Sequence, residues 1–84
     1  MKYRIESAPL ADHYVVVAKD PNTGDIFQYF TLNESGLDML SLFDRFSNEE
    51  SVASEMAKMY EVPIDVITHD VHAFAEFLKK KKLI

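Results

Sequence analysis

Two imidazoles and two carboxylates near the C-terminus have a spacing that is compatible with metal binding. These residues are Asp65, His69, His72 and Glu76, and successive members are four, three and four positions apart in the sequence. A helix would place all four in one row along its surface. The same residues also make the ordinary polar face of an amphipathic helix. Because neither a His-Glu-x-x-His motif nor a third nearby histidine supports a metal site, we predict that the chain binds no metal.

The sequence lacks the motifs of nucleophilic catalysis and of nucleotide binding. Serine, histidine and aspartate all occur, but no serine stands in a Gly-x-Ser-x-Gly elbow. The two glycines, Gly24 and Gly36, cannot form a dinucleotide-binding or Walker loop, and cysteine is absent. The acidic pair Glu49-Glu50 stands at a predicted helix start, where the helix dipole accounts for it. We therefore predict that the chain is not an enzyme and uses no cofactor.

The run Lys79-Lys80-Lys81-Lys82 is the one basic cluster in a chain of net charge -5. An acidic chain repels a phosphate backbone, so nucleic acid is not an expected partner. Lysines at a helix C-terminus meet the negative end of the helix dipole, which explains the run without any binding role. An auxiliary contact with a bound partner is the alternative interpretation.

Length and hydropathy predict one small domain that covers residues 1–84. A chain of this length supports a single core. It hides only about 60 to 65% of its unfolded surface, which favours a surface groove over a deep active site. The first residues lack the apolar run of a secretory signal, and no stretch approaches the roughly 18 apolar residues of a membrane span. We expect a cytoplasmic protein without membrane contact.

Three segments in the first half have the patterns of β-strands. Lys2 to Glu6 alternates polar and apolar residues, and Ser7 to Asp12 breaks that pattern. His13 to Lys19 carries a β-branched run that is apolar on both faces, which is typical of a central strand. A turn from Asp20 to Asp25 then leads to a third strand, Ile26 to Leu32. The three strands are predicted to form an antiparallel sheet.

The second half has the apolar periodicity of three helices. The first is predicted from Glu34 to about Phe46, with Asn33 as its N-cap. The second ends at Pro63, and the third runs from Asp65 to about Lys81. Three antiparallel strands followed by three helices make an α+β fold with a winged helix-turn-helix-like layout.

The start of the second helix has two candidate caps, Ser47 and Asn48. Ser47 and Glu50 have the Ser-x-x-Glu spacing of a capping box, in which each side chain bonds the other residue's free amide. We therefore expect a capping box at this position.

The third strand is unusual because both of its predicted faces are apolar. One face is expected to hold Ile26, Phe30 and Leu32, and the other Phe27, Tyr29 and Thr31. In a three-strand meander this strand also lies at an edge, with unpaired backbone groups along one side. Such an edge can accept a further strand.

A groove is expected where this edge meets a second stripe of the third helix, formed by Val66, Asp70, Ala73 and Phe77. An extended peptide would add backbone hydrogen bonds to the edge and place alternate side chains in the groove. The residues alone leave two alternatives open, since the same aromatics would also suit an ordinary core or a homodimer interface.

Several short motifs, in order and at matching spacing, resemble the PqqD family from about residue 13 to residue 84. They are Leu32-Asn33 after an aromatic strand, Gly36, the stretch from Met56 to Val62, Asp70-Val71 with Phe74 and Leu78, and Leu83-Ile84. The resemblance implies a precursor-peptide recognition element from the biosynthesis of ribosomally synthesised, post-translationally modified peptides. Its partners would be the leader segment of a precursor and a radical SAM or other peptide-modifying enzyme.

The resemblance also implies that the leader binds as an added strand on the third strand, beside the third helix. By position, the peptide-binding residues would be Ile26, Phe27, Gln28, Tyr29, Phe30, Thr31, Asp70, Ala73, Phe74 and Phe77. The chain departs from the family pattern at Arg45-Phe46, in place of an Asp-Gly turn, and at Lys82, in place of glycine. The alternative function is a winged-helix DNA-binding or protein-interaction domain of a regulator.

Overall fold

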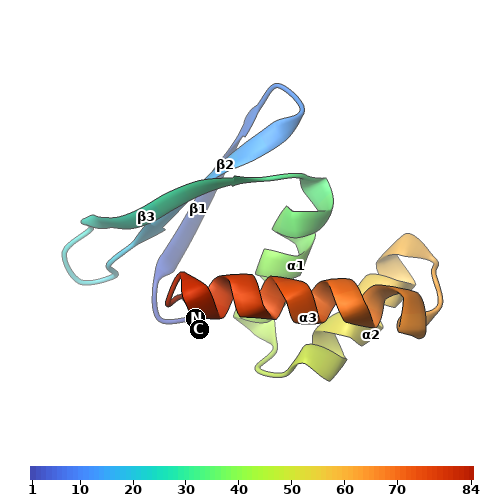
Figure 1. Ribbon diagram of the computed structural model, residues 1–84. Coiled ribbons are helices and arrows are strands. Elements are labelled where there is room, and N and C mark those ends of the chain that lie inside the picture. The colour runs from blue at the N-terminus through green and yellow to red at the C-terminus, as the bar shows by residue number, and fades with distance from the viewer.

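The computed structural model describes residues 1–84 as three strands followed by three helices (Figure 1). The elements are β1 (Arg4–Leu10), β2 (His13–Lys19), β3 (Ile26–Leu32), α1 (Glu34–Arg45), α2 (Glu49–Tyr60) and α3 (Ile64–Lys80). The predicted α+β fold is confirmed. No helix combines the length and the apolar character needed to cross a bilayer.

The sheet is an antiparallel meander in the order β1-β2-β3, so β2 is central and β3 is an edge, as predicted. β1 is longer than the sequence pattern indicated. Residues 7–10 continue the strand instead of breaking it, and only Ala11 and Asp12 form the turn, with Ala11 at φ 56°. Pro9 is tolerated because an edge strand does not need every backbone donor.

A β-bulge interrupts the pairing of β2 with β3. Ala18 lies opposite Gln28 and Lys19 opposite Ile26, which leaves Phe27 as an extra residue. A bulge shifts the side-chain alternation by one position. Ile26 therefore lies on the outer face of the sheet with Lys19 and, contrary to the prediction, does not share a face with Phe30.

The helix starts follow local capping chemistry. The Asn33 side chain accepts the Gly36 amide at 2.8 Å, as expected of the predicted N-cap. At α2, Asn48 is the cap and accepts the Ser51 amide at 2.8 Å. The predicted capping box between Ser47 and Glu50 is wrong. With Asn48 as the cap, Glu50 is only two residues after the cap, whereas a capping box needs the acidic residue three positions after it.

The core lies between the inner face of the sheet and the three helices. It contains Val16 and Ala18 from β2 together with the most deeply buried helix residues, which include Leu40, Met56 and Leu78. These residues are at most 1% exposed, and the core includes no charged or polar residue. The outer face of the sheet has no helix over it (Figure 1).

The chain ends by folding back onto this core. The Leu83 amide donates to the Leu78 carbonyl at 2.9 Å, and the Lys82 amide donates to the Lys79 carbonyl at 3.0 Å. This is the Schellman pattern of helix termination, with Lys82 at φ 60° in the position that usually holds glycine. Leu83 is thereby buried, and the turn forms despite the family departure at this residue.

Candidate functional site

An apolar groove lies between the end of β3, the first turn of α1 and the middle of α3. Its volume is about 360 Å³. The lining residues are Thr31, Leu32, Asn33, Ser35, Gly36, Met39, Asp70, Ala73, Phe74 and Phe77. Asp70 is the one charged residue among them.

Aromatic packing holds α3 along the edge of the sheet. The Phe30 ring in β3 meets the Phe77 ring edge to face, with centroids 5.5 Å apart and planes at 80°. Phe77 stacks on Phe74 at 5.5 Å, and Phe74 lies 6.2 Å from the ring of Phe43 in α1. This chain of rings joins β3, α3 and α1. Two of its members, Phe74 and Phe77, form the aromatic wall of the groove.

A polar contact sets the position of the C-terminal end of α3. The side-chain amide of Gln28 donates to the backbone carbonyl of Lys81. Because Gln28 lies near the start of β3 and Lys81 just beyond α3, the helix runs antiparallel to the strand. The start of β3 is therefore near the end of α3, and the end of β3 is near Asp70.

Five of the ten side chains predicted for the site line this groove: Thr31, Asp70, Ala73, Phe74 and Phe77. Two more, Gln28 and Phe30, face α3 and hold it in place without lining the groove. The remaining three, Ile26, Phe27 and Tyr29, do not point into it. All three belong to β3, whose edge backbone runs past the same region.

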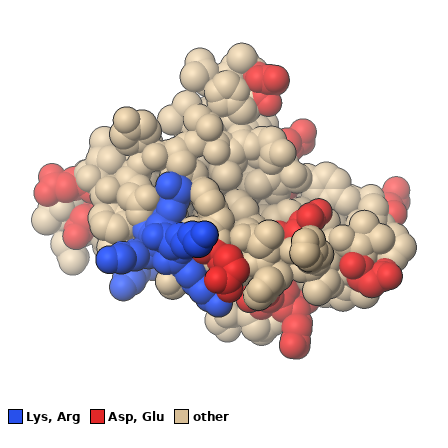
Figure 2. All heavy atoms as spheres, in the orientation of Figure 1, with Lys and Arg blue, Asp and Glu red and all other residues tan.

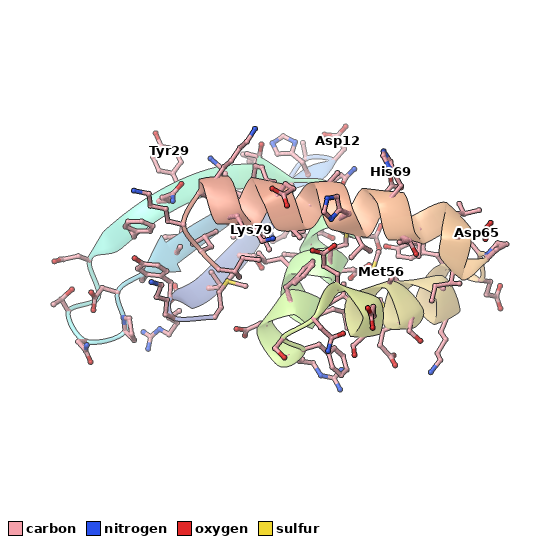
Figure 3. The ribbon with its side chains drawn as sticks, turned by 60° about the horizontal axis from the view of Figure 1, so that its bottom comes forward. Asp12, Tyr29, Met56, Asp65, His69 and Lys79 are labelled. Atoms are coloured by element: carbon pink, nitrogen blue, oxygen red, sulfur yellow. The ribbon has the colours of Figure 1, made fainter.

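Tyr29 and Ile26 lie on the outer face of the sheet. Tyr29 is 76% exposed and Ile26 is 61% exposed. Figure 3 shows the Tyr29 side chain pointing away from α3. In a peptide added as a strand to β3, only the side chains that face away from the groove would contact Tyr29 and Ile26.

Phe27 has a different environment because of the bulge. Its ring stacks on Tyr3, with centroids 4.3 Å apart and planes within 3°. Tyr3 immediately precedes β1, so the stack connects the two outer strands across β2. This contact gives the Phe27 side chain a structural role.

The first turn of α1 is part of the groove, which the sequence pattern did not indicate. The cap Asn33 and the first-turn residues Ser35 and Gly36 line it, together with Met39 in the second turn. A Cβ added to Gly36 would lie 3.1 Å from Asn33 Oδ1 and 3.3 Å from the Leu32 side chain, so glycine allows the cap to close tightly. The order of the elements could have predicted this part of the groove, because a helix that directly follows an edge strand must begin beside the end of that strand.

The four residues considered for metal binding do not converge. His72 Nδ1 lies 2.8 Å from Glu49 Oε1 of α2, whereas its Nε2 lies 3.9 Å from Glu76. Asp65 and His69 project outward from α3 (Figure 3). No three His, Asp or Glu side chains are close enough to share an ion. His72 instead connects α3 to the start of α2.

A larger cavity, of about 640 Å³, is lined by Phe43 of α1, the connection between α1 and α2, residues of α2 and α3, and the C-terminal residue. Its lining includes Ser47, Asn48, Glu50 and Lys79. No strand contributes to its lining, so it offers no row of free backbone groups to an extended ligand. The smaller groove beside β3 is therefore the better candidate for recognition.

Together, the three-strand sheet, the three helices and the apolar groove beside a free strand edge define a small winged-helix-like α+β domain. The chain belongs to the PqqD family, because the family model described as "Coenzyme PQQ synthesis protein D" matches residues 15–84. The resemblance predicted from the sequence motifs is thereby confirmed.

A solved structure resembles the whole domain. It is described as "TbiB1 in Complex with the TbiA(beta) Leader Peptide" and is 26% identical in sequence, with a TM-score of 0.66. The match covers 99% of this chain and 93% of that chain. No curated protein matches the chain at a significant level.

Proposed function

We propose that this domain binds the leader segment of a ribosomally synthesised precursor peptide and presents it to a modifying enzyme. The observation that carries the proposal is the groove between β3 and α3, which combines apolar walls with a free strand edge. TbiB1, the solved relative, is described as a complex with a leader peptide, which supports the same class of ligand here.

The binding mode we propose is strand addition to β3. The edge backbone of residues 26–31 would supply hydrogen bonds, which give affinity with little sequence preference. Alternate side chains of the leader would enter the groove and meet Ala73, Phe74 and Phe77. Successive side chains of a strand point to opposite faces, so about every second leader residue would carry specificity.

The domain itself is proposed to carry out no chemistry. The groove holds one carboxylate, Asp70, and lacks the paired acid and base or the activated nucleophile that acyl or phosphoryl transfer requires. Modification would then be the task of a separate enzyme, such as a radical SAM enzyme, with this domain as its substrate adaptor.

The test uses short open reading frames beside the gene as a source of candidate leaders. A synthetic leader is titrated into ¹⁵N-labelled protein, and amide shifts and hydrogen exchange are followed. We expect the shifts to concentrate in residues 26–31 and along α3. Alternate amides of β3 should become protected from exchange, because only every second residue of a strand presents its amide to a given neighbour.

Shifts confined to α2 and β1 would contradict the proposed site. The alternative of a DNA-binding domain predicts a gel shift that is strongest at low salt, where phosphate contacts are least screened. An absence of any shift at low salt would discard that alternative.

A further inference from the structure

Basic residues gather at one place on the face that carries α3. Figure 2 shows Lys and Arg side chains together over the C-terminal end of α3, whereas acidic residues are spread around the rest of this face. The residues of this basic patch are Lys79, Lys80, Lys81 and Lys82. In a chain of net charge -5, this grouping is a local reversal of sign.

The basic patch adjoins one end of the groove. The Gln28 side chain bonds the carbonyl of Lys81, which keeps the patch beside the start of β3. The Lys81 ammonium lies 5.5 Å from the ring centroid of Phe30 and 5.2 Å from that of Phe77. A cation above two rings is held in place by their negative faces. The patch is therefore continuous with the aromatic wall that a bound peptide would follow.

Most of the patch has no anionic partner within the domain. Lys79 lies 3.4 Å from Glu76, but no carboxylate lies within 4.0 Å of the ammonium groups of Lys80, Lys81 or Lys82. The helix dipole acts on the last turn of α3 and does not explain Lys82, which lies beyond the helix in a left-handed conformation where glycine is favoured. A lysine at this position adds charge at a conformational cost.

The opposite end of the groove carries the opposite charge. Asp70 lines the groove near the end of β3, and no basic group lies within 4.0 Å of its carboxylate. An extended peptide along β3 would thus pass from a cationic end to an anionic end. We infer that the basic patch binds acidic side chains of the bound leader, and that the charge difference between the two ends fixes its register. This inference rests on the proposed function.

The geometry gives the spacing of the charges that the peptide should carry. Asp70 and Lys81 are eleven residues apart, which at about 1.5 Å per helical residue is about 16 Å. A strand rises about 3.3 Å per residue, so this span corresponds to about five peptide residues. A matching leader has Asp or Glu about five residues from Lys or Arg, with apolar side chains between them.

The test is a selection of displayed random 15-residue peptides on three forms of the domain. The first is the wild type, and the second carries Lys80→Gln and Lys82→Gln, both at exposed positions. The third is a matched control, Arg45→Gln and Lys58→Gln, which removes the same charge elsewhere. We expect wild type and control to enrich peptides with acidic residues at one end. The Lys80/Lys82 variant should lose only that preference, and should bind the wild-type peptides about three- to tenfold more weakly at low salt.

The outcomes separate this inference from the proposed function. If no peptide is enriched on the wild type, peptide binding itself fails and the inference fails with it. A second outcome is that the selection enriches peptides that have no acidic end and whose binding is abolished by Ala73→Trp. In that case peptide binding in the groove stands, and the role of the lysines is refuted. If a labelled single-stranded dT20 oligonucleotide binds more tightly than the selected peptides and is lost in the Lys80/Lys82 variant, the basic patch serves phosphate and the inference is overturned.

Discussion

The rings of Phe30 in β3 and Phe77 in α3 meet edge to face, with centroids 5.5 Å apart. This contact joins the sheet to the helix at Phe77, which also lines the groove. The positive edge of one ring faces the negative face of the other, which favours this arrangement beyond the burial of area alone. The pair therefore holds α3 against β3 beside the groove.

A double-mutant cycle should detect the coupling between these two rings. We expect Phe30→Leu, Phe77→Leu and the double variant to give a coupling of about 1 kcal/mol in the free energy of unfolding, measured by urea denaturation. A coupling below about 0.3 kcal/mol would show that the two rings act independently.

Filling the groove should block binding without unfolding the domain. Ala73 is exposed on α3 and lines the groove, so Ala73→Trp places an indole where leader side chains would enter. We expect at least a tenfold loss of leader affinity by calorimetry, with the free energy of unfolding changed by less than about 1 kcal/mol. Ala8→Trp, the same change at an exposed position in β1, is the control. Equal losses in both variants would remove the groove from consideration.

Phe27 should act through stability, because its ring stacks on Tyr3 at 4.3 Å. Phe27 is 41% exposed, so Phe27→Ala should lower the free energy of unfolding by about 1 to 2 kcal/mol. Leader affinity should stay within about twofold. Tyr29→Ala, on the outer face, should change stability by less than about 0.5 kcal/mol. If Phe27→Ala weakened binding and left stability unchanged, the residue would belong to the binding surface after all.

Tyr60 should give the domain an alkaline transition. Its hydroxyl donates to Asp38 at 2.5 Å, and this hydrogen bond raises the pKa of Tyr60 to about 12. Because the pKa is higher in the folded state, the contact contributes its full stability below the ordinary tyrosine pKa of about 10 and loses it as the pH rises through about 12. In a phenolate titration at 295 nm, Tyr60→Phe should remove the step at highest pH. Asp38→Asn should move that step to lower pH, and a step left in place would exclude Asp38 as the cause.

Local signals explain what could be predicted from the sequence. The bounds of β2 and β3, the Asn33 cap and the three helices follow from alternation, capping chemistry and apolar periodicity, which act between residues close in the chain. The groove side of α3 was also predictable, because Asp70, Ala73 and Phe77 fall on one helical stripe. These features required no knowledge of distant contacts.

Long-range pairing decided the rest. The break predicted after Glu6 disappears because residues 7–10 pair with residues 13–16 of β2. The faces of Ile26 and Phe27 depend on a bulge, which the register against β2 sets and the pattern of β3 alone does not. The first turn of α1 joins the groove, and the basic patch reaches the start of β3, only because packing places α3 antiparallel to that strand. The sequence by itself determined the elements and their amphipathic faces, whereas the tertiary structure decided which faces meet, because that choice depends on contacts between residues far apart in the chain.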